Sequence, residues 1–203
     1  MPGLVVILNG VPRSGKSSIA RAMQRTLSQS WLNFGVDAMM QHVLPQSQLP
    51  GLGLRPGGER PDLEAEVERQ FLGLYAAVAS LAEQGCSVVV DAGHHDGYSR
   101  SLNLLPRCCA QIAHLPTLLV GLYCPIEEIL RRRRQSSTEY ESAAPGEPVP
   151  APVQRWQDAV HVPGRYDLTL DTGQQSPTAC AAAIERALAD VKPGTGMVAE
   201  LAG

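Results

Sequence analysis

The stretch Gly10-Val11-Pro12-Arg13-Ser14-Gly15-Lys16-Ser17 fits the pattern G-x-x-x-x-G-K-[ST] and directly follows the apolar residues 4–8. A short apolar run of this kind is typical of a buried parallel strand. Glycines allow the loop after the strand to curl until its backbone N–H groups point at phosphate oxygens, and the next helix adds the positive end of its dipole. The stretch therefore predicts a nucleotide-phosphate cradle between a strand and a helix.

Two side chains of this loop have roles set by its chemistry. The lysine of such a loop reaches the β- and γ-phosphates and the next hydroxyl binds Mg²⁺, which assigns these roles to Lys16 and Ser17. A glycine-rich turn that only begins a helix is the structural alternative. The loop residues predicted to bind nucleotide are Gly10, Val11, Pro12, Arg13, Ser14, Gly15, Lys16, Ser17 and Ser18.

The composition favours one α/β domain. The chain has 203 residues, 44% of them hydrophobic, which suffices for one sizeable core. A net charge of −3 gives no global basic field for nucleic acid, and no apolar run approaches the ~20 residues of a membrane span. The five cysteines show no metal-ligand spacing. We expect a cytoplasmic protein with reduced thiols and no nucleic-acid or membrane partner, either monomeric or a homo-oligomer.

Apolar runs alternate with segments long enough for helices, which predicts a parallel sheet flanked by helices. The predicted strands cover residues 4–8, 31–36, 86–90, 117–123 and 166–170. The predicted helices cover residues 15–28, 62–84, 125–134 and 176–190. We expect one domain over residues 1–190, with a lid over about 131–155 and a flexible tail over 191–203.

Two segments rich in proline break this alternation, at residues 44–61 and 136–152. Ligands of open α/β sheets bind beyond the carboxyl ends of the strands, so both segments are placed to cover an acceptor. Mobile surface loops without function are the alternative.

Acidic residues close two of the predicted strands at the edge where the cradle lies. Asp37 ends the block Phe34-Gly35-Val36-Asp37 and is placed to orient an acceptor hydroxyl and take its proton. Capping of a short helix is the alternative for Asp37. Asp91 follows the apolar residues 88–90 and is the candidate partner of Ser17 at Mg²⁺, with a turn-forming acid as the alternative.

The segment after Asp91 reads Ala92-Gly93-His94-His95-Asp96. Its position allows contact with substrate, and metal binding stays open. Adjacent histidines are not a standard ligand spacing, so a polar loop is the favoured interpretation.

Four consecutive arginines, residues 131–134, lie on the helix expected after the fourth strand. They spread around a helix, so at most two face one ligand. An arginine that closes over the transferred phosphoryl group would neutralise charge in the transition state. A solvated surface and an RNA-binding patch are the alternatives.

Several blocks together match one family pattern. They are Ile7-Leu8-Asn9-Gly10, Trp31-Leu32 with Phe34-Gly35-Val36-Asp37, Val120-Gly121-Leu122-Tyr123-Cys124, Val160-His161, Tyr166-Asp167-Leu168 and Leu170-Asp171-Thr172. On these blocks the chain resembles the chloramphenicol phosphotransferase-like family of P-loop kinases, over most of the domain.

The resemblance implies a fold like that of nucleoside monophosphate kinases, a five-stranded parallel sheet flanked by helices with a lid after the fourth strand. It implies ATP and Mg²⁺ as cofactors, Asp37 as the base, and adenine near Thr172. A lid arginine nine residues beyond Cys124 corresponds to Arg133. The expected catalytic set is thus Asp37, Lys16 and Arg133, with Ser17 and Asp91 at the metal.

The chain departs from the family where the acceptor is chosen. Residues 135–140 replace a Gly-Asp-Arg type segment, and the insert 44–61 has two notable apolar anchors, Leu52 and Leu54. The resemblance therefore supports phosphoryl transfer more strongly than chloramphenicol as the acceptor.

Three functions stay open at this point. The leading one is an ATP-dependent kinase for a hydroxyl of a small molecule, chloramphenicol or another antibiotic or natural product. A metabolic or toxin-type kinase acting on a nucleotide or nucleotide-sugar would need more basic residues near 44–61 than Arg55 and Arg60. A nucleotide-binding switch without transfer is disfavoured by the carboxylate of Asp37.

Overall fold

A computed structural model describes residues 1–135, 142–144 and 146–203. Its five strands form one sheet in the order β2-β3-β1-β4-β5, with every neighbouring pair parallel. The strands are β1 (Val5–Asn9), β2 (Trp31–Asn33), β3 (Ser87–Ala92), β4 (Thr117–Tyr123) and β5 (Leu168–Asp171). The predicted five-stranded parallel sheet is confirmed.

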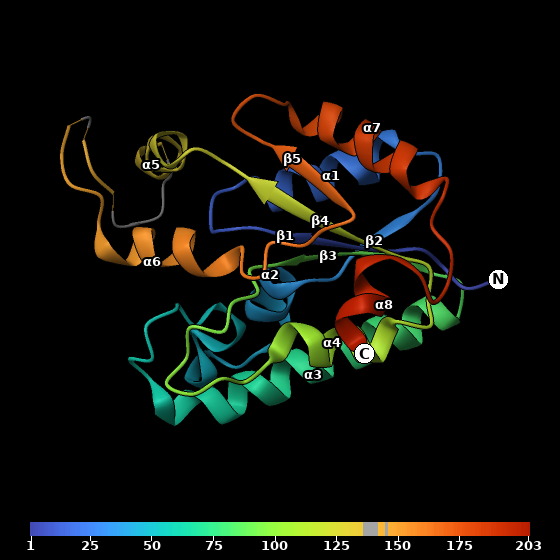
Figure 1. Ribbon diagram of the computed structural model, residues 1–203, viewed down its shortest axis with the longest axis horizontal. Coiled ribbons are helices and arrows are strands. Elements are labelled where there is room, and N and C mark those ends of the chain that lie inside the picture. The colour runs from blue at the N-terminus through green and yellow to red at the C-terminus, as the bar shows by residue number, and fades with distance from the viewer. Residues whose placement is uncertain (136–141, 145) are drawn as a thin grey trace.

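Helices cover both faces of this sheet (Figure 1). Residues of the central strand alternate between two cores: Val6 and Leu8 pack with α1 and α7, while Val5 and Ile7 pack with α3 and α4. Full burial on both faces explains why β1 is a continuous apolar run. The α-helices are α1 (Lys16–Thr26), α2 (Val36–Ala38), α3 (Pro61–Glu83), α4 (Leu104–Ile112), α5 (Ile126–Arg134), α6 (Ala151–Val160), α7 (Pro177–Leu188) and α8 (Gly196–Ala202).

Several predicted element bounds were wrong. Strand β2 ends at Asn33 instead of residue 36, because the chain turns at Gly35 into α2 and the π-helical turn η1 (Met39–Val43). Helices α4 and α6 were not predicted; α4 contains Pro106, and α6 begins at the end of the proline-rich stretch 136–152 with Pro152 in its first turn. Both prolines lie in the first turn of their helix, where no intrahelical N–H bond is lost.

The segment predicted as a flexible tail instead forms α8 and packs against α4 and β4. Val198 of this helix is buried in the core. Asp167 holds it in place, since one carboxylate oxygen accepts from the Met197 N–H at 2.8 Å and the other from the Leu119 N–H of β4 at 2.8 Å. The glycines and proline of residues 192–196 form the turn that leads into this helix rather than a frayed end.

The insert 44–61 is packed, so an unstructured surface loop is the wrong interpretation there. It contains two 3₁₀ turns, η2 (Gln46–Gln48) and η3 (Gly51–Gly53). Leu52 and Leu54 are buried in the core beside α3. The Leu54 carbonyl lies 2.9 Å from Nε2 of His95.

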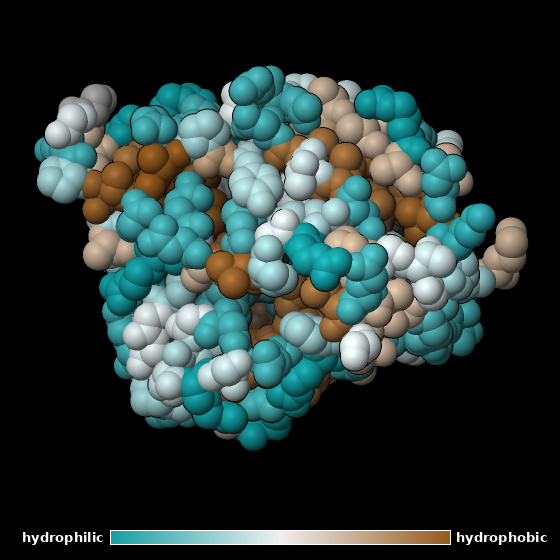
Figure 2. All heavy atoms as spheres, viewed as in Figure 1, coloured by the Kyte–Doolittle hydropathy of each residue, from teal (hydrophilic) through white to brown (hydrophobic). Residues whose placement is uncertain are grey.

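The lid region stands out at one end of the molecule, where α5 and α6 lie beyond the sheet (Figure 1). Figure 2 shows apolar side chains gathered where these two helices face each other. They belong to a small core that includes Ile129, Leu130, Val153 and Trp156. Of the predicted loop 136–152, residues 136–141 and 145 lie outside the described part of the chain.

No helix among the described residues is long and apolar enough to cross a bilayer. All five cysteines are free thiols.

Candidate active site

A cavity of about 830 Å³ lies at the carboxyl edge of the sheet. Its walls come from the phosphate loop and α1, from α2 and the turns after it, from the exit of β3, from the lid helices, and from the segment between β5 and α7. A second hollow, of about 740 Å³, lies at the amino-terminal edge of the sheet around Gly3 and Cys86. None of the predicted site residues lines that second hollow.

The phosphate loop takes the shape that its sequence predicts. Gly15 has a φ of +98°, in the left-handed region that favours glycine, and α1 begins immediately after it. The loop begins where the Gly10 N–H donates to the Ala92 carbonyl at 3.2 Å, which fixes it to the end of β3. The N-terminus of an eleven-residue helix therefore faces the cavity behind the loop.

Lys16 reaches back across this loop. Its Nζ donates to the carbonyl oxygens of Gly10 at 2.8 Å and Val11 at 3.0 Å. Burial lowers the pKa of Lys16, while the charges of Asp91 and Asp37 oppose that shift. A half-buried ammonium near two carboxylates places a positive charge in the wall of the cavity.

Two carboxylates converge on one hydroxyl. Ser17 Oγ lies 2.8 Å from Oδ2 of Asp37 and 3.2 Å from Oδ2 of Asp91, and a single hydroxyl proton serves only one of them at a time. Burial, followed by the charge of Asp37, raises the pKa of Asp91, and the nearby Lys16 opposes this. Hydroxyl and carboxylate oxygens of this kind suit Mg²⁺, so the residues present fit that ion.

Asp37 reaches this site by a route different from the predicted one. It lies in the first turn of α2 and not at the end of β2. The alternative that Asp37 caps this helix was wrong as well, because the N-cap residue is Gly35. Even so, the predicted association of Ser17, Asp37 and Asp91 is found.

The lid arginine at the cavity is Arg132 and not Arg133. Arg132 donates to the carbonyl oxygens of Arg13 at 3.2 Å and Thr172 at 2.6 Å, and to Glu128 at 2.7 Å. Arg133 is buried on α5 and is not among the described residues that line the cavity. One step along a helix turns a side chain by about 100°, so Arg132 and Arg133 point in different directions, and the role that the resemblance implies for Arg133 stays a prediction.

Thr172 lies at the cavity end nearest β5, next to the phosphate loop. Its N–H donates to the Tyr123 carbonyl at 2.9 Å, which fixes the chain after β5 against β4. Gln175 and Cys180 line the same end of the cavity and were missed in the sequence analysis. No local motif marks them: Gln175 lies in the turn between β5 and α7, and Cys180 lies within α7.

The cavity is also lined by apolar side chains. Val36, Met40, Leu52 and Trp156 line it, together with the backbone at Gly53 and Gly93. Trp156 belongs to α6, and its ring meets the ring of His95 edge to face at 5.0 Å between centroids. Met40 and Trp156 were missed because neither η1 nor α6 was predicted.

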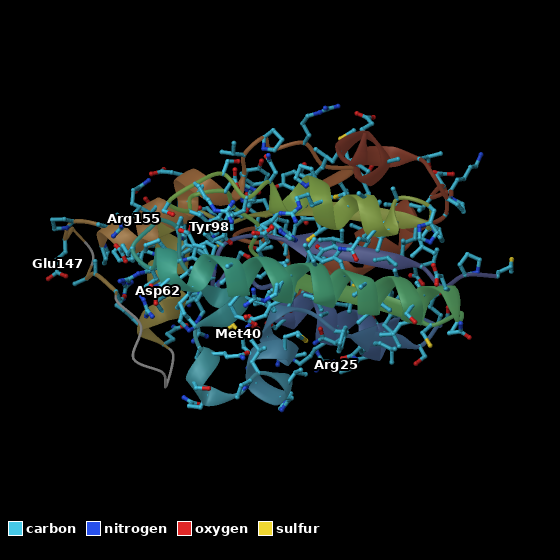
Figure 3. All side chains as sticks on the ribbon, turned by 90° about the horizontal axis from the view of Figure 1, so that it is seen from below. Arg25, Met40, Asp62, Tyr98, Glu147 and Arg155 are labelled. Carbon is cyan, nitrogen blue, oxygen red and sulfur yellow. The ribbon has the colours of Figure 1, made fainter. Side chains whose placement is uncertain are left out.

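Three arginines of the insert and α6 are each paired with a carboxylate. Arg155 of α6 lies 2.6 Å from Glu59, and Arg55 lies 3.0 Å from the same carboxylate. Arg60 pairs with Asp62 at 2.6 Å. Figure 3 shows Arg155, Asp62 and Tyr98 at the same end of the molecule, where the insert, the exit of β3 and α6 come together.

His94 and His95 form structural contacts in the segment after β3. Nε2 of His94 lies 2.7 Å from the Tyr75 hydroxyl, and the His94 N–H donates to Asn9 at 2.8 Å. Burial lowers the pKa of His94 to about 3.

His95 packs on Tyr98 with ring centroids 4.4 Å apart. Among the described residues no three histidine, cysteine or acidic side chains form a metal cluster, and neither histidine lines the cavity. The polar-loop interpretation therefore agrees with the geometry.

Comparison with known proteins agrees with this architecture. A family model described as chloramphenicol phosphotransferase-like protein matches residues 3–189. The chain is 28% identical over 145 residues to a UPF0200 protein of Aeropyrum pernix, covering 68% of this chain and 70% of that one.

Two solved structures show the same fold at low identity. One is the APS kinase CysC of Mycobacterium tuberculosis in complex with AMPPNP and APS, at 20% identity and a TM-score of 0.59, with 93% of this chain and 99% of that chain covered. The other is the tunicamycin resistance protein of Deinococcus radiodurans, at 15% identity and a TM-score of 0.60, with 96% and 99% covered. The fold is that of P-loop kinases.

Proposed function

The chain belongs to the chloramphenicol phosphotransferase-like family, and we propose that it moves the γ-phosphoryl group of ATP to a hydroxyl of a small uncharged molecule, chloramphenicol or a related antibiotic or natural product. One observation carries the proposal. Asp37 and Asp91 converge on Ser17 beside Lys16, in a cavity that is also lined by apolar side chains.

The site residues then have distinct tasks. Lys16 and the amides of the phosphate loop hold the phosphates, and Arg132 lies where the loop meets the segment after β5. Ser17 and Asp91 would hold Mg²⁺, and the bound ion would neutralise part of the phosphate charge. Asp37 orients the acceptor hydroxyl and takes its proton during in-line transfer.

The apolar part of the cavity lining supports an uncharged acceptor. A nucleotide or nucleotide-sugar acceptor carries phosphate and favours arginines that are free to bind it. Each arginine near the insert already pairs with a carboxylate: Arg55 and Arg60 of the insert, and Arg155 of α6. The fold neighbour named as a tunicamycin resistance protein supports an antibiotic acceptor by analogy only.

The test of this function is transfer of label from [γ-³²P]ATP. Chloramphenicol, a panel of hydroxylated antibiotics, and nucleotides are each offered to the wild type and to Lys16→Ala. We expect label on an antibiotic with the wild type and none with Lys16→Ala, because Lys16 is the side chain proposed to hold the phosphates. Label found only on nucleotides would replace this proposal with the metabolic kinase, and no label on any acceptor despite tight ATP binding would favour a switch.

Trp156 should contribute to binding of the acceptor. We expect Trp156→Ala to raise the KM for the acceptor about tenfold and to leave the KM for ATP within twofold, since the loss of one aromatic contact costs about 1.4 kcal/mol. Steady-state kinetics with each substrate varied in turn measures both constants. Trp31→Phe is the control, because Trp31 is buried on β2 in a different core. Equal changes in both KM values would contradict a role confined to the acceptor.

A further inference from the structure

The approach of Gly35 to β3 leaves no room for a side chain. A Cβ on Gly35 would lie 2.1 Å from Oδ1 of Asp91, 2.4 Å from its backbone nitrogen and 2.6 Å from its carbonyl oxygen. The φ of Gly35 is −134° and its ψ is −161°, an extended conformation open to any residue. Glycine is therefore required here for space and not for backbone freedom.

Asp91 contacts the start of α2 from the neighbouring strand. Its Oδ1 lies 3.4 Å from the N–H nitrogen of Asp37, while its Oδ2 lies 3.2 Å from Ser17 Oγ. Helix starts need an acceptor for their free N–H groups, usually a side-chain oxygen of the N-cap residue. The N-cap of α2 is Gly35, which has no side chain, so Asp91 supplies an oxygen from β3.

The segment before Asp37 is thus fixed to β3 at successive points. The Phe34 N–H donates to the Val89 carbonyl at 3.0 Å, Gly35 contacts Asp91, and the Asp37 N–H faces the same carboxylate. At the end of this segment the Asp37 carboxylate lies 2.8 Å from Ser17 Oγ.

We propose that Gly35 and Asp91 are positioning residues that place the carboxylate of Asp37 for proton transfer. The inference rests on the proposed function, in which Asp37 takes the proton of the acceptor hydroxyl. It gives Asp91 a second role in addition to binding the metal. One carboxylate oxygen faces Ser17, and the other holds the backbone of the segment that carries Asp37. It also gives a functional reason for the close approach that requires glycine in the block Phe34-Gly35-Val36-Asp37.

A methyl group at position 35 must displace this backbone. Real Cβ atoms do not approach other heavy atoms closer than 3.0 Å, so Gly35→Ala has to move the segment by about 1 Å from Asp91. Misplacement of a catalytic group by about 1 Å costs up to about 100-fold in rate. We therefore expect kcat to fall about 100-fold in Gly35→Ala, with the Kd for the ATP analogue AMPPNP within threefold of wild type.

Gly73→Ala is the matched control. Gly73 lies within α3 with nothing within 4 Å of its would-be Cβ, so the same change of side chain should leave kcat and AMPPNP binding unchanged. A value of kcat for Gly35→Ala within threefold of wild type would overturn the proposal.

A second pair of variants separates positioning from metal binding. Asp91→Asn keeps an oxygen that can accept from the Asp37 N–H, whereas Asp91→Ala removes it, and both remove the charge. We expect amide hydrogen exchange at Asp37 to be at least tenfold faster in Asp91→Ala than in Asp91→Asn. Equal exchange rates in the two variants would refute positioning by Asp91.

The exchange measurement also distinguishes failure of this inference from failure of the proposed function. If the wild type labels no acceptor, the proposed function fails, while the exchange rates at Asp37 still report whether Asp91 fixes the backbone. If Gly35→Ala does not fold, the pair of Asp91 variants decides the inference alone.

Discussion

Replacing Asp37 with asparagine is expected to lower kcat for phosphoryl transfer about 10²- to 10⁴-fold, the usual contribution of a general base. Asparagine has nearly the same shape and keeps an oxygen near Ser17, but it does not take a proton from an alcohol. The phosphate loop and Lys16 are unchanged, so the Kd for ATP, measured by calorimetric titration, should stay within about threefold. Steady-state kinetics with the labelled acceptor measures kcat.

Asp190→Asn is the control for this substitution. Asp190 is an exposed acid just beyond α7 and does not line the cavity, so its variant should match the wild type in kcat and KM. If Asp37→Asn keeps full kcat and only raises the KM for the acceptor, then Asp37 binds the acceptor without accepting its proton.

The phosphate loop and the sheet could be predicted from the sequence because both depend on local patterns. The motif ending in Lys16-Ser17 fixes the loop, and continuous apolar runs mark strands that are buried on both faces. Since carboxyl ends of parallel strands meet at one edge, the approach of Asp91 to Ser17 also followed from the order of the elements, whereas Asp37 reaches Ser17 from α2.

What escaped prediction depends on contacts between distant segments. Arg132 and Arg133 are neighbours in sequence, and only the packing of α5 decides which one faces Thr172. Helix α8 is held by Asp167, thirty residues before Met197. Trp156 lines the cavity from α6, a helix that was not predicted because it begins at the end of the proline-rich stretch 136–152.

The structure gives a physical reason for several of the family blocks. Asn9, at the end of β1, donates from Nδ2 to the Val160 carbonyl at 3.2 Å and lies 3.0 Å from the Tyr166 hydroxyl. That hydroxyl in turn lies 2.7 Å from Nδ1 of His161. Blocks that are far apart in the chain therefore meet where α6 joins the base of the phosphate loop.

His94 should make the protein sensitive to acid. Its ring is buried and stays neutral in the folded state, because burial lowers its pKa to about 3, whereas an unfolded histidine titrates near its ordinary value of 6.5. Below pH 6.5 the unfolded chain binds a proton that the folded chain does not, so the free energy of unfolding falls as the pH falls toward 3. Within that window, each fall of one pH unit lowers the free energy of unfolding by about 1.4 kcal/mol.

His94→Gln should therefore flatten the dependence of stability on pH. Glutamine does not titrate and still offers polar groups to the Tyr75 hydroxyl. Between pH 8 and pH 4.5 we expect the wild type to lose about 2 to 3 kcal/mol more of its unfolding free energy than the variant, as measured by urea unfolding at fixed temperature. His114→Gln is the control, because His114 is exposed and contacts only the exposed Glu83 among the described residues. Parallel curves for wild type and His94→Gln would show that His94 is not kept neutral by the fold.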